Sequence, residues 1–362
     1  TCDRTRSAMV ESLRRRLISD VPLGVFLSGG IDSSLVCALA VKKLGVTPRT
    51  FSIGFENDPQ SEHSKAENTA TLLETVHSQH VFTAADFDGI GRKIGSLLDE
   101  PNGDRSCVPT YLLCKFAREQ VIVALSGDGG DELFAGYDRY GYMSDFAGDQ
   151  PSDFIDRYYR DALPVFGKEA TLAAFPGEQT SLESDLDIGL PLFQHPGRHV
   201  IHGLRQLDFA YYMTGAVLPK VDRMSMRSSL EVRTPFFSAD VCDEAAKLPT
   251  GYCWHSKTKM KKLVLRQILG ELVGREAGSQ QIAGLDTWKK TGFGMPASVF
   301  LNNRLAVQDE LNTAFESLKG TRFFKERKVA LEAMWKKVDQ NINSIWAFIV
   351  LGQWVRHFPV RL

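Results

Sequence analysis

The stretch that most constrains this chain is residues 23–34, which read Leu-Gly-Val-Phe-Leu-Ser-Gly-Gly-Ile-Asp-Ser-Ser. Residues 23–27 form a short apolar run, as expected of a strand that is buried on both faces of a parallel sheet. From Ile31 the apolar residues follow helical spacing as far as Leu44. A strand, a glycine turn and a helix point free backbone N–H groups and the positive end of a helix dipole at an anion. The stretch therefore predicts an anion-binding turn.

The composition of this turn favours phosphate as the anion. Its two glycines let phosphate oxygens approach the main chain, and the serines around them supply hydroxyl donors. No lysine follows the glycines, so the turn is not the G-x-x-x-x-G-K-[ST] loop. The alternative is a glycine-rich strand–helix turn without a ligand. Asp32, Ser33 and Ser34, which follow in register, argue against that alternative.

The composition of the chain is that of an ordinary soluble enzyme. It has 362 residues, 43% of them hydrophobic and 24% charged, with a net charge of −1. This balance gives no reason to expect a nucleic-acid or polybasic membrane-binding surface. The most apolar stretch, residues 345–351, is far shorter than the roughly 20 residues that span a bilayer. No signal peptide is recognised in residues 1–16, and the six cysteines form no C-x-x-C pair. We therefore expect reduced thiols and a cytoplasmic location.

Strands and helices are expected to alternate over the first 140 or so residues, which indicates a doubly wound parallel α/β sheet. From residue 204 onward the pattern reads as helical throughout. We therefore expect a nucleotide-binding lobe at 1–142 and a mostly helical lobe at 143–362. The expected strands are 23–27, 50–55, 80–82 and 121–126. An opening helix is expected at 5–18, and helices between the strands are expected at 31–44, 62–75, 87–98 and 111–118.

A second glycine cluster, Ser-Gly-Asp-Gly-Gly-Asp-Glu at residues 126–132, closes the strand expected at 121–126. Acidic and hydroxyl side chains gathered at a strand end are unfavourable unless a cation binds there. A Mg²⁺ ion carrying a triphosphate meets that need, because hard cations take carboxylate oxygens. A Gly/Asp loop without a ligand is the competing interpretation. Both glycine turns follow strands, and ligands of such sheets bind at the carboxyl ends of the strands.

Five blocks in order then resemble one family. They resemble the synthetase domain of the glutamine-hydrolysing asparagine synthetases, in the ATP pyrophosphatase (PP-loop) superfamily. The resemblance implies an adenine nucleotide α-hydrolase-like fold. The blocks are the turn at 28–34, the segment 99–111, the second glycine cluster, Val221–Met226 with Leu230–Phe236, and Lys290–Pro296.

The resemblance assigns roles to individual residues. Asp32 and Asp131 match acids that bind Mg²⁺, and Lys290 matches a lysine that faces the activated substrate. Asp128 stands where the family usually has a glutamate implicated in forming the acyl-adenylate. Asp222, Arg223, Glu231 and Arg233 are either site residues or a structural ion-pair network. The positions that match ATP contacts are Leu27, Ser28, Gly29, Gly30, Asp32, Ser33, Ser34, Ile53, Ser126 and Gly127.

The implied reaction is adenylation of a carboxylate by ATP with release of pyrophosphate, followed by attack of ammonia and loss of AMP. Aspartate is the expected acceptor and asparagine the expected product. Two other interpretations stay open. In one, the enzyme is a related amidotransferase or cyclase whose acceptor is a sugar acid, a β-lactam precursor or a peptide. In the other, the chain is a catalytically silent binding subunit. A homodimer also stays open.

Two departures from the family pattern bear on the acceptor, and a third on the nitrogen source. Asp128 shortens a side chain at a sensitive point, and Ser238 replaces the aspartate that often follows P-F-[FL]. Only about twenty residues separate Cys2 from the first expected strand. We therefore expect no glutaminase within this chain, an incidental Cys2, and ammonia that is free or supplied by a separate or excised glutaminase.

Overall fold

The structure is a computed structural model whose described residues form two compact units that interleave along the sequence. The first unit comprises residues 1–82, 110–141 and 201–292, and the second comprises 83–109, 142–200 and 293–362. The compact units thus do not follow the division at residue 142 that composition suggests. The residues that the structure describes are 1–56, 63–146, 153–154, 157–158, 199–274, 294, 304–318 and 338–358.

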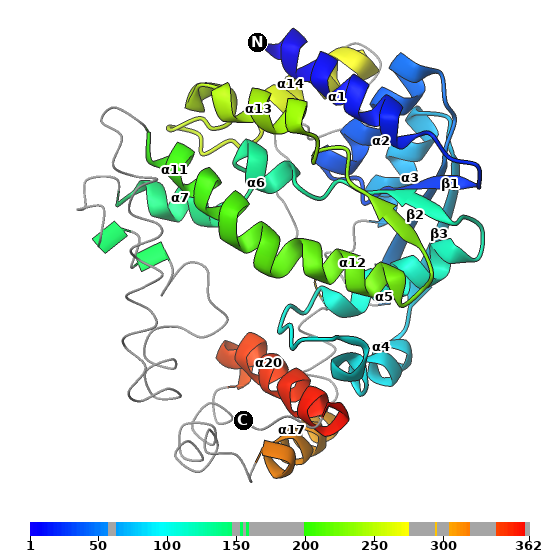
Figure 1. Ribbon diagram of the computed structural model, residues 1–362, viewed down its shortest axis with the longest axis vertical. Coiled ribbons are helices and arrows are strands. Elements are labelled where there is room, and N and C mark those ends of the chain that lie inside the picture. Colours follow the sequence, from blue (N-terminus) through cyan, green and yellow to red (C-terminus); the bar gives the residue numbers. More distant parts are fainter. Residues whose placement is uncertain are drawn as a thin grey trace. The chain divides into compact units, whose positions relative to one another are not determined.

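The first unit contains a five-stranded sheet in the order β3-β2-β1-β4-β5, and its strand pairs are all parallel (Figure 1). β1 pairs with β2 on one side and with β4 on the other, so the strand order reverses between β1 and β4. Such a reversal is the switch point where doubly wound sheets bind ligands. The predicted fold class is confirmed. The strands are β1 (Leu23–Phe26), β2 (Arg49–Phe55), β3 (Val76–Phe82), β4 (Val123–Leu125) and β5 (Glu231–Arg233).

β5 corrects the expectation that the chain is helical from residue 204 onward. It pairs with β4, with Val232 opposite Ala124, and the N–H of Ser126 bonds to the carbonyl of Arg233 at 3.0 Å. A strand of three residues is too short to show an alternating pattern, so its conformation depends on pairing with a distant segment rather than on local sequence.

Helices cover both faces of the sheet. α2 (Ile31–Leu44) and α3 (His63–Leu72) connect β1 to β2 and β2 to β3, and right-handed crossovers place both on one face. α5 (Cys107–Arg118) lies on the opposite face (Figure 1). Its Leu113 and Ala117 belong to one core cluster with Phe51 and Ile53 of β2. The rings of Phe51 and Phe116 meet edge to face at 5.9 Å. The α5 helix therefore anchors the sheet on the side away from α2.

The opening helix, expected at 5–18, is observed as α1 (Cys2–Arg16) and packs against α2 and α13. α14 packs against α2 as well, and it follows the loop that enters the site described below. The remaining helices of this part of the chain are α6 (Gly130–Phe134), α7 (Asp138–Ser144), α11 (Val200–Leu207), the π-helix η3 (Asp208–Val217), α12 (Leu218–Met226), α13 (Ala239–Lys247), η4 (Thr250–Tyr252) and α14 (Leu263–Val273).

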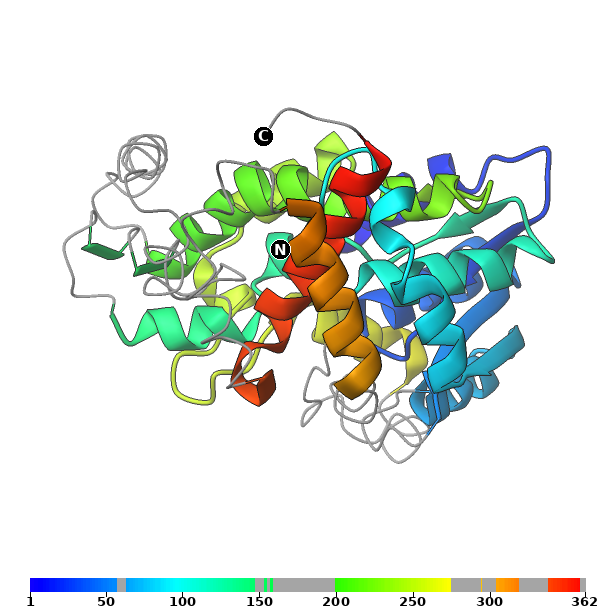
Figure 2. The ribbon, with the colours of Figure 1, turned by 90° about the horizontal axis from the view of Figure 1, so that it is seen from below.

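The second unit is helical in its described part. It contains α4 (Ala84–Gly91), η1 (Ile94–Leu97), α17 (Arg304–Leu318) and α20 (Val338–His357). α17 and α20 lie side by side (Figure 2) and share an apolar core. Gln353 of α20 accepts a hydrogen bond from the N–H of Gly95 at 3.0 Å and donates to the carbonyl of Gly91 at 2.8 Å. This side chain satisfies backbone groups that would otherwise be buried without partners.

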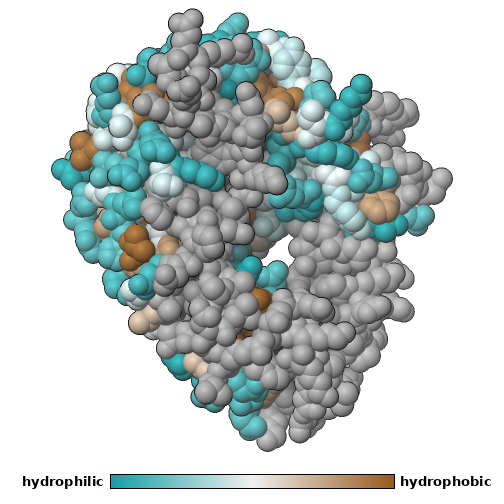
Figure 3. All heavy atoms as spheres, turned by 180° about the vertical axis from the view of Figure 1, so that it is seen from behind, coloured by the Kyte–Doolittle hydropathy of each residue, from teal (hydrophilic) through white to brown (hydrophobic). Residues whose placement is uncertain are grey.

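The face shown in Figure 3 is mainly hydrophilic over its described residues, with hydrophobic side chains scattered among them. Among the helices of the described ranges, none combines the length and the apolar character needed to cross a bilayer. All six cysteines fall within these ranges and are free thiols. Burial raises the pKa of the Cys37 thiol to about 12, so this cysteine is unreactive at neutral pH.

The side chain of Arg233 has a structural role. Its Nη1 donates to the carbonyl oxygens of Arg16 and Ile18 at 2.8 and 2.7 Å, and its Nε donates to Glu231 at 2.7 Å. The last carbonyls of a helix have no partner inside the helix. Arg233 supplies a donor to the carbonyl of Arg16 and so connects the end of α1 to β5. For Glu231 and Arg233 the structure supports the ion-pair alternative over a role in the site.

Replacing Arg233 with alanine should lower the free energy of unfolding by about 1–3 kcal/mol, because it removes charged hydrogen bonds to the carbonyl of Arg16, the last residue of α1, and to that of Ile18 just beyond the helix. Urea denaturation followed by circular dichroism measures this change. Arg14→Ala is the matched control, since Arg14 makes an exposed ion pair with Glu11 on the same helix. That variant should lose less than about 0.5 kcal/mol. Equal losses would show that Arg233 does not anchor α1.

Candidate functional site

The two glycine turns meet at the switch point of the sheet. Parallel pairing sets Val25 opposite Leu125, so β1 and β4 end at the same edge. A Cβ atom added to Gly127 would lie 2.9 Å from the backbone nitrogen of Ser33. One added to Gly130 would lie 2.4 Å from a carboxylate oxygen of Asp32. The second turn therefore packs directly on the start of α2, and only glycine permits that approach.

The first turn has the geometry of an anion site. Gly29 has φ +76°, and a Cβ there would lie 2.7 Å from the backbone of Lys65 and Ala66 at the start of α3. Gly30, in an extended conformation, is the N-cap of α2 and has no side chain with which to cap the helix. The positive end of the α2 dipole therefore lies at this turn, where it favours an anion.

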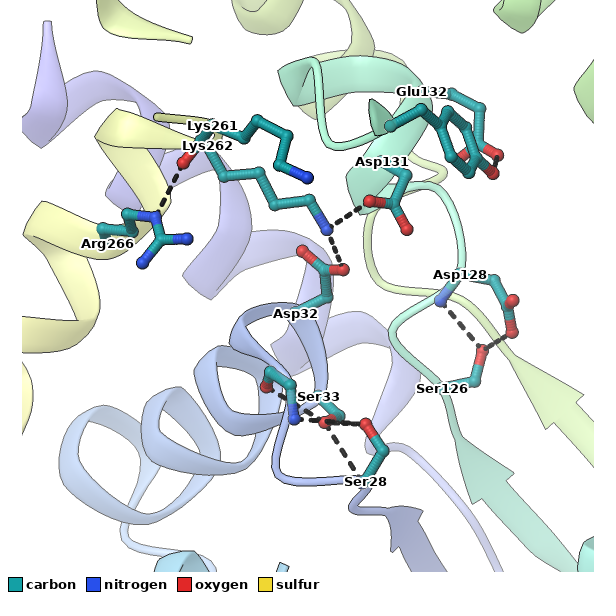
Figure 4. A network of polar contacts seen from close by, with 12 residues as sticks. Ser28, Asp32, Ser33, Ser126, Asp128, Asp131, Glu132, Lys261, Lys262 and Arg266 are labelled. Atoms are coloured by element: carbon teal, nitrogen blue, oxygen red, sulfur yellow. Dashed lines mark hydrogen bonds and ion pairs between the residues drawn. The ribbon is translucent and has the colours of Figure 1, made fainter. Parts of the chain in front are cut away.

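Hydroxyl groups gather at the same helix end. The hydroxyls of Ser28 and Ser33 lie 3.1 Å apart, and the N–H of Gly30 donates to Ser28 Oγ at 3.2 Å (Figure 4). Ser34 is fully buried, and its hydroxyl has no hydrogen-bond partner within the described part of the chain. A buried hydroxyl without a partner is unfavourable unless a ligand supplies one.

The expected adenosine positions are Leu27 and Ile53, and the structure buries both side chains. The N–H of Leu27 bonds to the carbonyl of Phe51 at 2.8 Å, which continues the pairing of β1 with β2 beyond the last strand residue. Ile53 belongs to the core cluster shared with α5. These side chains shape the floor beside the turn; contact with an adenosine stays a prediction.

Asp128 lies in the second turn, and its carboxylate bonds to Ser126 rather than joining those of Asp32 and Asp131. The hydroxyl of Ser126 donates to Asp128 Oδ2 at 2.7 Å, and Figure 4 shows the Asp128 carboxylate turned toward that serine. Ser126 itself is buried. The assigned role of Asp128 in forming an acyl-adenylate remains a prediction.

Asp32 and Asp131 come together around a cation that the sequence analysis did not identify. The Nζ atom of Lys262 contacts Asp32 Oδ2 and lies 2.7 Å from Asp131 Oδ1 (Figure 4). The Lys262 side chain is only 8% exposed, and each carboxylate is 16% exposed. Burial alone would lower the pKa of Lys262, but the charges of Asp131 and Asp32 and their hydrogen bonds raise it above its ordinary value. Lys262 is therefore a buried ammonium ion.

One sequence signal pointed to Lys262, although weakly. It is the last of four lysines in residues 257–262 and directly precedes the apolar helix α14. A run of lysines is usually a solvated loop, and its neighbour Lys261 does pair with the exposed Asp138. Only the packing of α14 against α2 brings one of these lysines to the glycine turns.

The pair of carboxylates fits a magnesium ion held jointly with a nucleotide. In the described ranges, no group of three or more histidine, cysteine or acidic side chains is placed to bind a metal alone. Asp32 and Asp131 are nevertheless close enough to share one cation, as their contacts with Lys262 show. Mg²⁺ commonly binds through one or two carboxylates plus substrate phosphates and water. Lys290 lies outside the described residues.

The sheet, its switch point and the turn at 28–34 define a nucleotide-binding α/β protein with a pyrophosphate-type loop. Comparison with known families agrees: the asparagine synthase family model matches residues 4–341. The chain belongs to this family, whose fold is that of the PP-loop superfamily.

Curated relatives match over the same region. Asparagine synthetase [glutamine-hydrolyzing] 1 of Bacillus subtilis is 30% identical over 96% of this chain and 58% of its own length. A putative asparagine synthetase of Mycobacterium tuberculosis is 29% identical over 69% of the chain and 42% of its own length. One of Methanocaldococcus jannaschii is 39% identical over 44% of the chain and 31% of its own length. The chain therefore spans little more than half of the first relative.

Alanine at position 29 should lower the free energy of unfolding by about 2 kcal/mol or more, because it combines a left-handed backbone with clashes against the backbone of α3. Gly30→Ala is the matched control. Gly30 has φ −70°, and its Cβ would meet only Ser28 Oγ, at 3.2 Å. That variant should stay within about 1 kcal/mol of the parent. Thermal unfolding of the two variants measures this difference. Similar losses of stability in both would contradict the geometry described for Gly29.

Proposed function

We propose that this chain is the synthetase part of an ATP-dependent amide-forming ligase. It adenylates a carboxylate, with aspartate as the first candidate, releases pyrophosphate, and passes the acyl group to ammonia. The observation that carries the proposal is the meeting of two glycine turns at the switch point, with Asp32 and Asp131 sharing one cation. Membership of the asparagine synthase family supports the same reaction.

The first turn is suited to hold the leaving pyrophosphate. Phosphate oxygens would meet the N–H groups at the start of α2 and the hydroxyls of Ser28, Ser33 and Ser34. Main-chain groups of the second turn, at Ser126 and Gly127, would border the nucleotide from β4. A leaving group held by fixed donors departs more readily, because the donors are already oriented when charge develops.

Adenylation gives the carboxylate a leaving group, because a carboxylate cannot lose oxide when an amine attacks it. A carboxylate oxygen attacks the α-phosphorus of ATP, and the bond to the pyrophosphate oxygen breaks. The resulting acyl-adenylate is a mixed anhydride whose leaving group is AMP. Ammonia then attacks the acyl carbon, gives up a proton, and expels AMP to leave the amide. Mg²⁺, held by Asp32 and Asp131, would supply charge neutralisation of the phosphates when bound.

Asp128 and Ser238 bear on the choice of acceptor. Ser238 is the N-cap of α13 and accepts a hydrogen bond from the N–H of Val241 at 3.3 Å. Serine and aspartate are both good N-caps, so this departure from the family pattern preserves a structural role. Asp128 is the departure that leaves the acceptor open.

The cellular setting is proposed on the same basis. The named relatives are glutamine-hydrolysing asparagine synthetases, so ammonia for this reaction would come from a glutaminase or from solution. A cytoplasmic location and a homodimer are compatible with this proposal. Neither is needed for the chemistry at the glycine turns.

Pyrophosphate release should require ATP, Mg²⁺ and aspartate, and asparagine should form when ammonium is added. Glutamate, β-lactam precursors and sugar acids serve as comparison acceptors in the same coupled pyrophosphate assay. Asp131→Asn should lower the rate by roughly 100-fold or more, because it removes a charged ligand of the metal–phosphate group. Release with another acceptor alone would overturn aspartate as substrate. Release with none would favour a silent binding subunit.

Lys290→Ala should lower kcat by roughly 100-fold or more with little change in ATP affinity. A fixed cation facing the α-phosphorus matters most in the transition state. The neighbouring Lys289→Ala is the matched control and should retain near-parental kcat. Steady-state kinetics with ATP and aspartate compare the two. Equal effects would show that the assignment of Lys290 is wrong.

A further inference from the structure

Lys262 is the one buried cation at the glycine turns that the reaction proposed above does not use, within the part of the chain that the structure describes. Its ammonium group lies between the carboxylates of Asp32 and Asp131, the two residues proposed to bind Mg²⁺ (Figure 4). The side chain reaches them from the loop before α14, opposite the two turns. Lys262 therefore occupies the space where a shared metal ion would bind.

The backbone around Lys262 is arranged for this reach. Lys262 is the N-cap of α14 and has φ 55° and ψ 39°, a left-handed conformation that is unfavourable for lysine. Such strain persists only where the surrounding contacts maintain it. The side chain then passes over Gly136, where an added Cβ would lie 2.1 Å from Lys262 Cε and 1.9 Å from Asp131 Oδ1. A side chain at position 136 would collide with both members of the ion pair.

Electrostatics make the two cations mutually exclusive. Two carboxylates held side by side repel each other, and a positive charge between them removes that repulsion. Mg²⁺ binds carboxylate oxygens at 2.0–2.1 Å, so an ion that bridges Asp32 and Asp131 would need the space between them that Lys262 Nζ fills. An ammonium group and a divalent ion so close together would repel strongly. We therefore expect the ammonium group to move away when a metal ion bridges the two carboxylates.

We propose that Lys262 is a positioning residue that holds Asp32 and Asp131 together until a metal–nucleotide complex displaces it. The proposal rests on the function proposed above. Bare Mg²⁺ would have to expel a buried ammonium that gains no new partner. Mg²⁺ that arrives with a triphosphate brings anionic oxygens to which the flexible lysine stem can turn. Lys262 therefore discriminates in favour of metal bound to nucleotide and against the free ion.

The test is a MgCl₂ titration without nucleotide, followed by thermal unfolding and by calorimetry. Lys262→Met keeps most of the side-chain volume and removes the charge. In EDTA its Tm should fall below that of the parent, and MgCl₂ should raise it in a saturable manner. Its Mg²⁺ affinity should exceed that of the parent at least 10-fold. Lys261→Met is the matched control and should behave as the parent does, since Lys261 pairs with the exposed Asp138.

A second variant keeps the test decisive where Lys262→Met does not fold in EDTA. Lys262→Gln removes the charge but keeps an N–H donor for the two carboxylates, so it should also gain Mg²⁺ affinity, by a smaller factor. The double variant Lys262→Met with Asp131→Asn should lose the response to MgCl₂. NaCl at matched ionic strength should reproduce none of these effects.

Unchanged Mg²⁺ affinity in both Lys262→Met and Lys262→Gln would overturn the proposal, as would an equal gain in Lys261→Met. These measurements use no carboxylate substrate and no turnover. A wrong acceptor would therefore appear in the pyrophosphate assay alone, whereas a wrong role for Lys262 would appear in the metal titration alone.

Discussion

The pairing of β1 with β4 is the constraint on which the rest of the site depends. Because the two strands are parallel and adjacent, the turns that follow them emerge at one edge and press against each other. Gly127 and Gly130 allow this contact, since a side chain at either position would collide with Asp32 or Ser33. Acidic side chains from sequence positions about one hundred residues apart therefore lie next to each other. The helix dipole of α2, the hydroxyls and the carboxylates converge only because these two strands are neighbours.

The sheet was largely predictable because its main signals are local. An apolar run, a glycine turn and a helical period follow one another directly in residues 23–34, and each predicts its own part of the β1–α2 unit. β5 was missed for the opposite reason. Its three residues, Glu231–Arg233, carry no period, and they form a strand because β4 pairs with them and because Arg233 binds the end of α1. A conformation maintained by distant partners leaves little trace in the local sequence.

The site shows the same distinction. Its turn residues were identified because they adjoin strands, and the structure brings Asp32 and Asp131 together as expected. Lys262 was not identified, because the lysines at 257, 259 and 261 around it are typical of a solvated loop. Its burial depends on how α14 packs against α2, which no short pattern reports. The roles of Asp128 and Lys290 follow from resemblance alone and stay predictions.

The two groups of paired charges described above differ in how their charged side chains are partnered. Arg233 and Glu231 neutralise each other, and the remaining Arg233 donors bind carbonyl oxygens, so the group is complete without a ligand. In the second group, one ammonium ion, Lys262, is shared by the carboxylates of Asp32 and Asp131. A divalent ion in place of the ammonium would bring the two carboxylates to neutrality, but it would leave the lysine without a partner. A triphosphate would supply that partner, which is the physical reason to expect metal and nucleotide to bind together.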